Sequence, residues 1–401
     1  MKIVLLTETF PRNMGYMVTI LPRLLARLGA DVHVVTTDLS AYWHIADFKE
    51  TYSGFVENME KMLGSIEQYD GYTLHTLPHQ RLLGYMRIMG MRKKLFEIRP
   101  DITYAVASIG WIALEAALWK PILGYKLFTG NHTTASVFPL AQRKQFKLDW
   151  TFIKSFLTRA IPGRLTSLVT TKCYGATKDC ADVAVRFFGV EDRKIDVCPL
   201  GVDTDLFSPP VTAGDFNDRA QFRNELGFSG DEIVCIYTGR FTEDKNPLIL
   251  GEAVARLVAQ GELYRAIFVG HGIQSDTLKQ LPGCTVFPFT PVEKLPRYYR
   301  SADIGIWPTQ ESTSMLDAAA CGLPLIVNDT LVATERIEGN GLTYRLNDVD
   351  DMVRVLLVLK DSSLRKKLGK VGAHKMASEF SWMSLAKRRF DDFEAALNNS
   401  Q

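Results

Sequence analysis

Short apolar runs alternate with segments of helical spacing along most of the first half of the chain. The segment 17–30 has helical spacing, with Pro22 inside it and Gly29 as a stop signal. The apolar runs are short and continuous, which is typical of strands buried in a parallel sheet. Such strands are predicted at 2–7, 31–37, 72–78, 101–107, 124–130, 167–177 and 194–201. This alternation predicts a doubly wound α/β domain.

The pattern stops at 202–221, which is rich in Asp, Pro and Gly, has no sustained period and is predicted to be a linker. It resumes with strands at 232–239, 264–270, 284–289, 302–308 and 323–329 and a helix at 247–260. The end of the chain, from 348–360 through 393–399, is predicted to be helical and amphipathic. We expect two Rossmann-like domains, at 1–205 and 222–375, that face each other across a cleft. The segment 376–401 is expected to form a C-terminal helix that crosses back to the first domain.

Composition favours a soluble globular protein: of 401 residues, 46% are hydrophobic and 23% are charged. The six cysteines form no C-x-x-C pair, so neither a disulfide framework nor a zinc site is indicated, and a reducing, cytoplasmic location is expected. The first apolar run is too short for a secretory signal. The apolar segment 102–119 contains Glu115, so we predict a buried strand and a buried helix there rather than a membrane span.

The net charge of +2 conceals an asymmetry. Residues 1–200 contain 25 Lys and Arg and 18 Asp and Glu, whereas residues 201–401 contain 22 and 27. A basic first half is typical of a protein that meets a phospholipid surface or a phosphorylated acceptor, although a chance distribution explains it equally well. Basic residues are interleaved with apolar ones at 81–96 and 143–164, which suits either an anionic bilayer or a helix face over the core. No nucleic-acid partner is expected.

Candidate ligand-binding residues follow the predicted strands. Gly15 comes after the first strand, His132 follows 124–130, and Arg240 and Lys245 follow 232–239 within "GRFTEDKNP". Glycine allows a ligand to approach the backbone closely, and two cations at a strand end suit an anion, although a solvated loop is the alternative. Neither a dinucleotide fingerprint nor a P-loop is present.

The stretch "PTQESTSMLDAAACGLPLI" at 308–326 combines a strand end, a polar turn and a helix of small residues. Ser312, Thr313 and Ser314 are expected to present free N–H groups at the start of this helix, an arrangement that suits a phosphate. Asp317 lies about one turn further along, where its carboxylate could accept hydrogen bonds from a ribose diol.

Several motifs, in order, resemble those of the family 4 retaining glycosyltransferases, which have the GT-B fold. They cover nearly the whole chain and begin with the first glycine loop and the histidine after "FTGN". The others are "KIDVCPLGVDTDLF" (194–207), "YTGRFTEDKNP" (237–247), "FVGHG" (268–272), "LPRYYRSADIGIWPTQES" (295–312), "LDAAACGLPLI" (316–326) and "ERIEGNGLTYRLNDVDDM" (335–352).

The resemblance implies a role for each candidate residue. Arg240 and Lys245 would bind the diphosphate of a nucleotide-sugar donor, and His132 would line the donor sugar and support its developing positive charge. Glu311 and Asp317 would match the two glutamates of the family, but five residues separate them here instead of seven. Glu311 therefore either sits on a shorter loop or does not contact the sugar. The remaining donor-binding candidates are Gly15, Gly239, Gly270, Phe289, Ser312, Thr313 and Ser314, with Phe289 in a loop expected to cradle the base.

The function implied is a metal-independent hexosyltransferase that uses a UDP or GDP sugar and no further cofactor. Its acceptor would be a glycan or a lipid-linked glycan in cell-surface polysaccharide synthesis, met at the inner face of the membrane. The D-x-D at 203–205 falls in the linker motif and is interpreted as structural rather than as a manganese site. The alternatives are a sugar phosphorylase, a nucleotide-sugar epimerase, or a non-catalytic scaffold subunit. Intact Arg240 and Lys245 argue against the scaffold.

Overall fold

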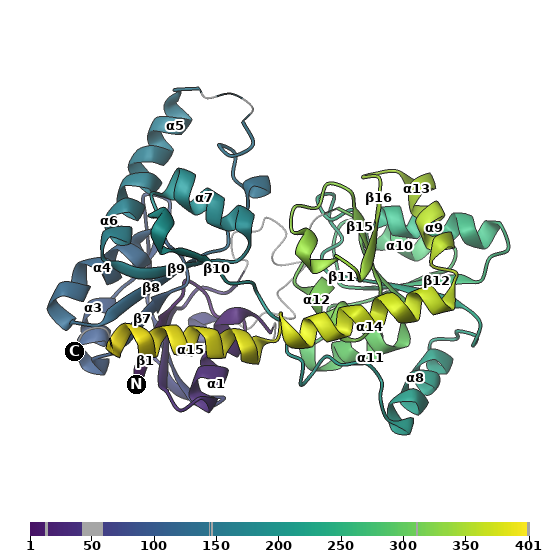
Figure 1. Ribbon diagram of the computed structural model, residues 1–401, viewed down its shortest axis with the longest axis horizontal. Helices are drawn as coiled ribbons and strands as arrows, with labels where there is room; N and C mark the ends of the chain where they lie inside the picture. Colours follow the sequence, from purple (N-terminus) through teal and green to yellow (C-terminus); the bar gives the residue numbers. More distant parts are fainter. Residues whose placement is uncertain (13–14, 42–58, 144, 146, 310–311, 399–401) are drawn as a thin grey trace. The chain divides into compact units, whose positions relative to one another are not determined.

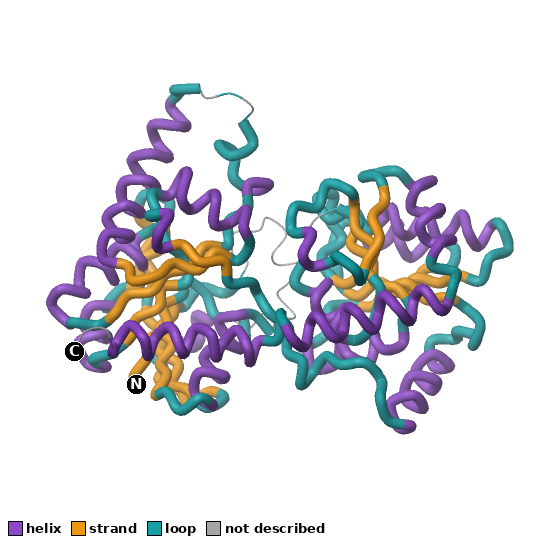
Figure 2. Tube along the Cα trace, viewed as in Figure 1, coloured by secondary structure: helices purple, strands orange, loops and turns teal. Residues whose placement is uncertain are grey.

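The computed structural model describes residues 1–12, 15–41, 59–143, 145, 147–309 and 312–398. Contacts divide the chain into two compact units, one formed by Met1–Leu200 with Met383–Gln401 and the other by Gly201–Trp382. In each unit helices flank a sheet of mainly parallel strands, as the purple and orange segments of Figure 2 show. The expected α/β architecture is therefore confirmed.

The first unit contains an eight-stranded sheet in the order β10-β9-β8-β7-β1-β2-β4-β3. All pairs are parallel except β3 with β4, and β3 lies outside the predicted strands. The strands are β1 (Lys2–Leu6), β2 (Asp31–Thr37), β3 (Ile66–Tyr69), β4 (Tyr72–Leu77), β7 (Ile102–Ala105), β8 (Lys126–Asn131), β9 (Thr170–Gly175) and β10 (Ile195–Val197). The central strands are fully buried, which explains their uninterrupted apolar sequences.

The helices of the first unit lie on both sides of this sheet (Figure 1). They are α1 (Met17–Arg27), α3 (Met91–Ile98), α4 (Trp111–Leu123), α5 (Trp150–Ser155), a π-helical turn (Phe156–Ala160), α6 (Ile161–Val169), α7 (Lys178–Phe188) and α15 (Trp382–Asn398). Pro22 is accommodated inside α1. Gly29 follows the end of this helix with a left-handed φ of 96°, as expected of a stop signal.

The apolar segment 102–119 forms the buried strand β7 and the first part of α4, as predicted. Glu115 is buried in α4 and forms an ion pair with Arg87. Burial raises the pKa of this carboxyl group, and the Arg87 guanidinium partly opposes the shift. Within the described residues, no helix has both the length and the apolar character needed to cross a bilayer.

The second unit contains six parallel strands in the order β13-β12-β11-β14-β15-β16. The strands are β11 (Ile233–Thr238), β12 (Tyr264–Val269), β13 (Cys284–Phe287), β14 (Ile304–Trp307), β15 (Leu325–Asn328) and β16 (Gly341–Tyr344), of which β16 was not predicted. The helices are α8 (Ala213–Glu225), α9 (Leu248–Ala259), α10 (Ser275–Gln280), α11 (Leu295–Ser301), α12 (Ser314–Ala320), α13 (Val349–Val358) and α14 (Ser362–Ser378).

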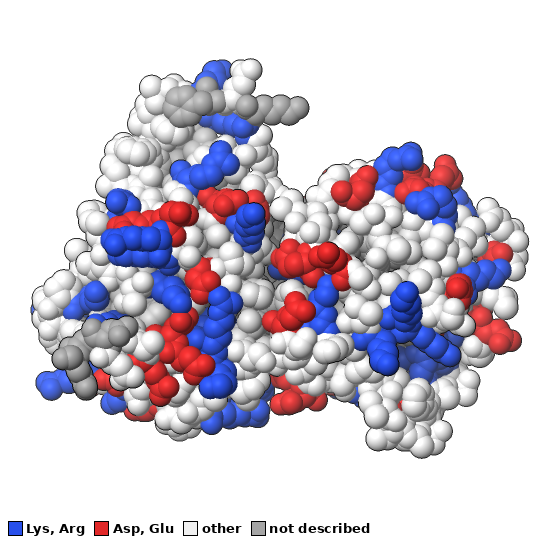
Figure 3. Space-filling model, in the orientation of Figure 1, with Lys and Arg blue, Asp and Glu red and all other residues white. Residues whose placement is uncertain are grey.

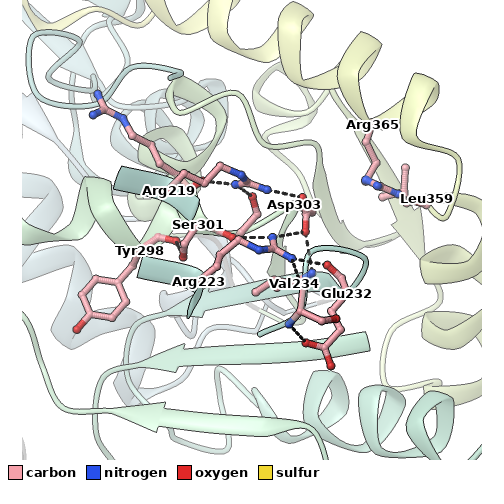
Figure 4. Close-up of polar contacts among 12 residues, drawn as sticks. Arg219, Arg223, Glu232, Val234, Tyr298, Ser301, Asp303, Leu359 and Arg365 are labelled. Carbon is pink, nitrogen blue, oxygen red and sulfur yellow. Dashed lines mark hydrogen bonds and ion pairs between the residues drawn. The ribbon is translucent and has the colours of Figure 1, made fainter. Parts of the chain in front are cut away.

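Helix α8 starts inside the segment predicted to be a linker, and this part of the prediction is wrong. A capping box of Thr212 and Asp215 begins the helix. Its last turns are fixed by charge, because Arg219 and Arg223 both bind the carboxylate of Asp303, at 2.7 and 3.0 Å (Figure 4). Asp303 also accepts a hydrogen bond from the N–H of Val234 at 2.9 Å. This network joins α8 to the amino ends of β11 and β14.

Candidate functional site

The second sheet has one topological switch point, between β11 and β14. From β11 the chain proceeds outward through β12 to β13, and from β14 it proceeds in the opposite direction through β15 to β16. In open parallel sheets, ligands bind outside the carboxyl ends of the strands at such a point. Gly239 and Arg240 follow β11 directly, and the polar turn before α12 follows β14. The sheet therefore brings these two candidate segments to one edge.

The loops after β11 and β12 contact each other through their backbones. The N–H of Gly239 donates to the carbonyl of Val269 at 3.0 Å, and the N–H of Phe241 donates to the carbonyl of His271 at 2.9 Å. A Cβ atom on Gly270 would lie 1.9 Å from the Gly239 carbonyl oxygen, and the φ of Gly270 is 152°. Gly270 is therefore required for the two loops to pack, whatever else they bind.

Arg240 and Lys245 lie on one loop between β11 and α9. The N–H groups of Lys245 and Asn246 both donate to the Thr242 carbonyl, at 3.0 and 2.7 Å, and Asn246 has a left-handed φ of 43°. The Arg240 guanidinium lies 3.3 Å from Asp244, and their side chains are 30% and 41% exposed. A loop of this kind holds two cations at the sheet edge, and the Asp244 carboxylate that pairs with Arg240 is itself exposed.

The start of α12 is fixed to the end of β11 by side-chain hydrogen bonds. The Trp307 indole N–H donates to the Ser314 hydroxyl at 3.1 Å and to the Thr238 carbonyl at 3.3 Å. The Ser314 hydroxyl also lies 2.8 Å from that of Ser312, and the Ser314 N–H lies 3.4 Å from the Ser312 hydroxyl. Ser314 was expected to offer a free N–H, but its polar atoms have partners within the turn.

Asp317 lies in the first turn of α12, close to Asp203 and Tyr299. Burial raises the pKa of Asp317 to about 8, and the charge of Asp203 adds to the shift. The carboxyl group is therefore largely protonated at neutral pH and can donate a hydrogen bond as well as accept one. Asp203 belongs to the D-x-D segment, where its side chain accepts a hydrogen bond from the N–H of Asp205 at 3.2 Å.

Two further candidates, Phe289 and Glu311, come after β13 and β14 in the sequence. Phe289 follows β13 and is partly buried. Glu311 lies outside the described residues, so the structure gives no position for its carboxylate. The chain just before it is held by Asn328, which donates to the Thr309 carbonyl at 2.5 Å, and by Tyr344, whose hydroxyl donates to the Pro308 carbonyl at 2.8 Å.

The candidates of the first unit lie at the carboxyl edge of its own sheet, whose switch point is between β1 and β7. Gly15 follows β1 with a left-handed φ of 61° and immediately precedes Tyr16, the N-cap of α1. His132 follows β8, which ends at the buried Asn131. The Asn131 amide donates to the Cys180 carbonyl at 2.7 Å and fixes the chain where His132 begins.

The imidazole of His132 is neutral at neutral pH. Desolvation by nearby protein atoms and the charge of Arg389 lower the pKa of His132 to about 4, while the residue as a whole is exposed. Arg389 extends from α15 and is 1% exposed, with its guanidinium carbon 5.1 Å from the ring centre of Tyr174. A neutral imidazole can accept a hydrogen bond or support positive charge without adding a charge of its own.

Sequence reasoning missed the residues that hold the site in place. Tyr299, whose hydroxyl lies 2.7 Å from that of Thr238, belongs to a helix that the sequence analysis did not single out. Trp307, Asn328 and Tyr344 are the last residues of β14, β15 and β16, and the sequence analysis assigned them no role. Their polar atoms contact partners that are distant in sequence, and no local pattern marks such pairs.

Two family models match the chain. A model described as "Glycosyltransferase Family 4" matches residues 14–206, and one described as "Glycosyl transferases group 1" matches residues 232–361. Together they include both sheets with the exception of β1.

Three curated relatives are named as glycosyltransferases or galactosyltransferases. The chain is 30% identical over 239 residues to D-inositol 3-phosphate glycosyltransferase of Geodermatophilus obscurus, a match that covers 55% of this chain and 50% of that protein. The chain thus spans about half the length of the first curated relatives that it matches. A protein of the same name from Xylanimonas cellulosilytica is 25% identical, with coverage of 96% and 92%. UDP-Gal:alpha-D-GlcNAc-diphosphoundecaprenol alpha-1,3-galactosyltransferase of Escherichia coli is 24% identical, with coverage of 61% and 63%.

Solved structures share the fold over the full length. Sucrose-phosphate synthase from Thermosynechococcus elongatus superimposes with a TM-score of 0.72 at 15% identity, covering 99% of both chains. HepE of Anabaena, in complex with UDP and glucose, gives a TM-score of 0.68 at 14% identity and covers 98% of this chain and 100% of its own. At these identities the likeness shows the fold, which is GT-B.

Proposed function

The chain belongs to the family 4 glycosyltransferases, and from this premise we propose that it is a retaining glycosyltransferase that uses a nucleotide-diphosphate sugar. The observation that carries the proposal is the convergence at the second switch point. There the loop that bears Arg240 and Lys245, the backbone of Gly239 and Gly270, and the first turn of α12 occupy one sheet edge. Two cations beside closely approachable backbone suit a diphosphate.

The proposed reaction exchanges one bond for another at the anomeric carbon. The bond from this carbon to the β-phosphate oxygen breaks, and a bond to the acceptor hydroxyl oxygen forms on the same face of the sugar. The acceptor proton passes to the departing phosphate oxygen, so no protein base is needed. Arg240 and Lys245 stabilise the charge that grows on the diphosphate in the transition state. Upon binding, the Arg240 guanidinium exchanges the exposed Asp244 carboxylate for phosphate oxygens.

Other candidates act on the remaining parts of the donor. Asp317 binds the ribose diol, and its raised pKa lets it both donate to one hydroxyl and accept from the other. Phe289 contacts the base. His132, neutral at working pH, lines the sugar and supports its oxocarbenium character. The E. coli relative is named for a UDP-galactose donor and HepE is bound to UDP, so we propose a UDP sugar as the first donor to test.

The acceptor is proposed from relatives alone. The E. coli protein is named for an acceptor on diphosphoundecaprenol, and a glycan or glycolipid in cell-surface polysaccharide synthesis is the corresponding proposal for this chain. Work at the inner face of the membrane would follow from such an acceptor.

The first experiment is a thermal-shift panel with UDP, GDP, ADP and their sugar conjugates. A nucleotide present at about 100 times its dissociation constant stabilises the folded state by roughly 2.7 kcal/mol. We expect UDP or UDP sugars to raise the melting temperature of the wild type and to leave an Arg240→Ala, Lys245→Ala double variant unchanged.

The matched control is Lys366→Ala, Lys367→Ala, which removes two exposed cations from α14 in the same unit. This variant should respond to the nucleotide as the wild type does. If the protein is a scaffold subunit, no nucleotide in the panel should raise its melting temperature. An equal response in the Arg240 and Lys245 variant would remove these two residues from the donor site.

A further inference from the structure

A continuous helical run at 150–169, formed by α5, the π-helical turn and α6, carries large apolar side chains on its solvent face. These residues recur three or four positions apart and so share one side of the helix. Trp150 is 73% exposed, Leu157 54% and Leu165 52%. We call the set the apolar stripe; it consists of Trp150, Ile153, Leu157, Ile161, Leu165 and Leu168.

The opposite side of α6 packs on the protein through small residues. Gly163, Thr166 and Ser167 are buried in α6. A Cβ atom on Gly163 would lie 1.9 Å from the Phe188 carbonyl oxygen, so α6 contacts the end of α7 closely. An ordinary surface helix has its large apolar residues inside and its polar residues outside. Helix α6 has the reverse arrangement, whereas in α5 Phe152, which is not part of the apolar stripe, packs against a buried cluster. Core packing therefore does not explain the residues of the stripe.

The charges within the segment 143–164 are almost all positive, and the acidic neighbour from outside it, Glu191, lies 3.6 Å from Arg164. Residues 143–164 contain six Lys and Arg and one acidic residue, Asp149. Asp149 is occupied within the segment, because it caps α5 through the N–H of Phe152 and pairs with Arg143 at 2.9 Å. Figure 3 shows the region that carries α5 as mainly white with blue patches. An apolar strip with basic neighbours complements a surface that has an apolar interior and a negatively charged outer layer.

We propose that the apolar stripe binds the surface of an anionic lipid bilayer, with the run 150–169 lying in the plane of the interface. The run is about 30 Å long, and its Lys154 and Arg164 side chains are exposed next to the stripe. Basic amphipathic helices with Trp and Leu on the apolar side bind bilayers in this way. Trp150 suits the headgroup level, where Trp is enriched. The inference is independent of the proposed sugar transfer.

A second copy of the chain fits the apolar stripe less well. A two-fold interface would bring the basic residues that flank the stripe in both copies into one interface, and like charges in an interface oppose association. The other basic segment, 81–96, does not form a continuous helix with an exposed apolar stripe. It forms a hairpin of β5 (His79–Leu82) and β6 (Tyr85–Ile88) followed by α3. Its Arg87 pairs with Glu115, and its Arg92 stacks on Trp119 with its guanidinium carbon 4.5 Å from the ring centre.

Vesicle flotation of the full chain tests the proposal. The wild type should float with vesicles that contain phosphatidylglycerol and stay at the bottom with pure phosphatidylcholine. A Trp150→Ser, Leu157→Ser, Leu165→Ser variant should lose flotation. A Lys147→Glu, Lys154→Glu variant should bind at least about tenfold more weakly, since each basic residue near an anionic surface contributes substantially.

Two control variants carry the same kinds of substitution at positions outside the apolar stripe. Val211→Ser, Leu263→Ser, Ile273→Ser removes three exposed apolar residues of the second unit, and Lys366→Glu, Lys367→Glu reverses two exposed charges. Both should float as the wild type does, and melting temperatures verify that each variant is folded. Wild type that stays at the bottom with anionic vesicles overturns the proposal, as does unchanged flotation of the stripe variant. A third outcome is that the wild type does not float but dimerises as its concentration rises. If only the stripe variant loses this dimerisation, the apolar stripe is an interface with a second copy.

Discussion

The carboxyl group of Asp317 is largely protonated at neutral pH, which is unusual for an aspartate. Its surroundings are the cause. It lies in the first turn of α12, where burial and the charge of Asp203 oppose ionisation and raise its pKa to about 8. No side chain in the described part of the chain forms an ion pair with it. A carboxyl group kept protonated in this way destabilises the fold at higher pH, and a ligand that offers hydroxyl groups can use it.

Asp317→Asn should change how stability depends on pH. Between about pH 4 and pH 8 the unfolded chain has released the Asp317 proton and the folded chain retains it, so the free energy of unfolding falls as pH rises. Asparagine does not titrate, and the variant should lose this slope and gain more than about 1 kcal/mol relative to the wild type at pH 8. Urea unfolding at pH 5 and pH 8 measures the effect.

Glu293→Gln is the control for this substitution, because Glu293 is exposed and its replacement should leave the slope unchanged. If Asp317→Asn unfolds with the wild-type slope, the carboxyl group is ionised in the folded protein. In the nucleotide panel the same variant should bind its donor more weakly, since an amide and a carboxyl group present different donors and acceptors to a diol.

At the scale of residues, the sequence predicted which residues follow which strands. It did not predict the hydrogen-bond partners or the protonation of their side chains. Arg240, Lys245 and His132 were identified because a residue just past a parallel strand lies at the carboxyl edge of the sheet. The internal partners of Ser314 depend on Trp307 and on Thr238, which is 76 residues away. The protonation of Asp317 depends on burial that only the assembled helix and sheet create. Glu311 lies outside the described residues, so its role stays a prediction.

At the scale of elements, α8 shows how a polar segment can be folded by charge. The Arg223 side chain is buried and donates to the Ser301 carbonyl at 3.1 Å and to the Glu232 carbonyl at 2.5 Å, besides binding Asp303 (Figure 4). The network lies at the amino ends of β11 and β14, the edge of the sheet opposite the candidate donor site. It orients the two strands that form the switch point.

Asp303→Ala should destabilise the second unit by roughly 3 kcal/mol, because it leaves two largely buried guanidinium groups without their carboxylate. The control is Asp350→Ala, which removes an exposed partner of Arg256 and should cost less than about 1 kcal/mol. Chemical denaturation of both variants compares the two costs. Equal losses in the two variants would contradict a buried network that holds α8.

The elements that the sequence missed share a cause. Prediction from hydrophobic period succeeds for fully buried strands such as β1 and β11, whose side chains are apolar on both faces. Helix α8 has no apolar period because Phe222 is its one buried apolar residue among those described, and Arg219 and Arg223 make its other main contacts. The edge strands β3 and β16 expose one or more positions and are four residues long, too short to form a clear pattern. The hairpin of β5 and β6 lies in a separate two-stranded sheet with little burial.

At the scale of the whole molecule, the second unit is an insertion within the first. The chain leaves the first unit after Leu200 and returns to it at Met383. The two crossings are paired, because the N–H of Val202 donates to the Phe380 carbonyl at 2.8 Å and the N–H of Trp382 donates to the Val202 carbonyl at 3.0 Å. Helix α15 then packs on the first unit, where Phe393 contacts Phe128 with ring centres 4.6 Å apart.

Deletion of residues 383–401 should unfold the first unit and spare the second. It removes the buried Phe393 and the carboxylate of Asp392, which accepts from the Tyr174 hydroxyl at 2.8 Å and pairs with Lys172. Limited trypsin digestion followed by mass spectrometry should recover a protected fragment near 201–382 and no protected fragment from 1–200.

The control for the deletion is Lys387→Ala, Asp391→Ala, which removes an exposed ion pair of α15 and should leave both units protected. Protection of 1–200 after the deletion would mean that the first sheet is stable without α15.

The pairing of the crossings has a consequence for how the protein is made. A ribosome releases the chain from its amino end, so most of the inserted unit emerges before Met383 appears. Much of the inserted unit can therefore fold before the first unit is complete. During this interval the nascent first unit lacks α15, and the aromatic surface of Phe128 and Tyr174 is uncovered. Residues that follow the inserted unit in the chain thus complete the unit in which residues 1–200 lie.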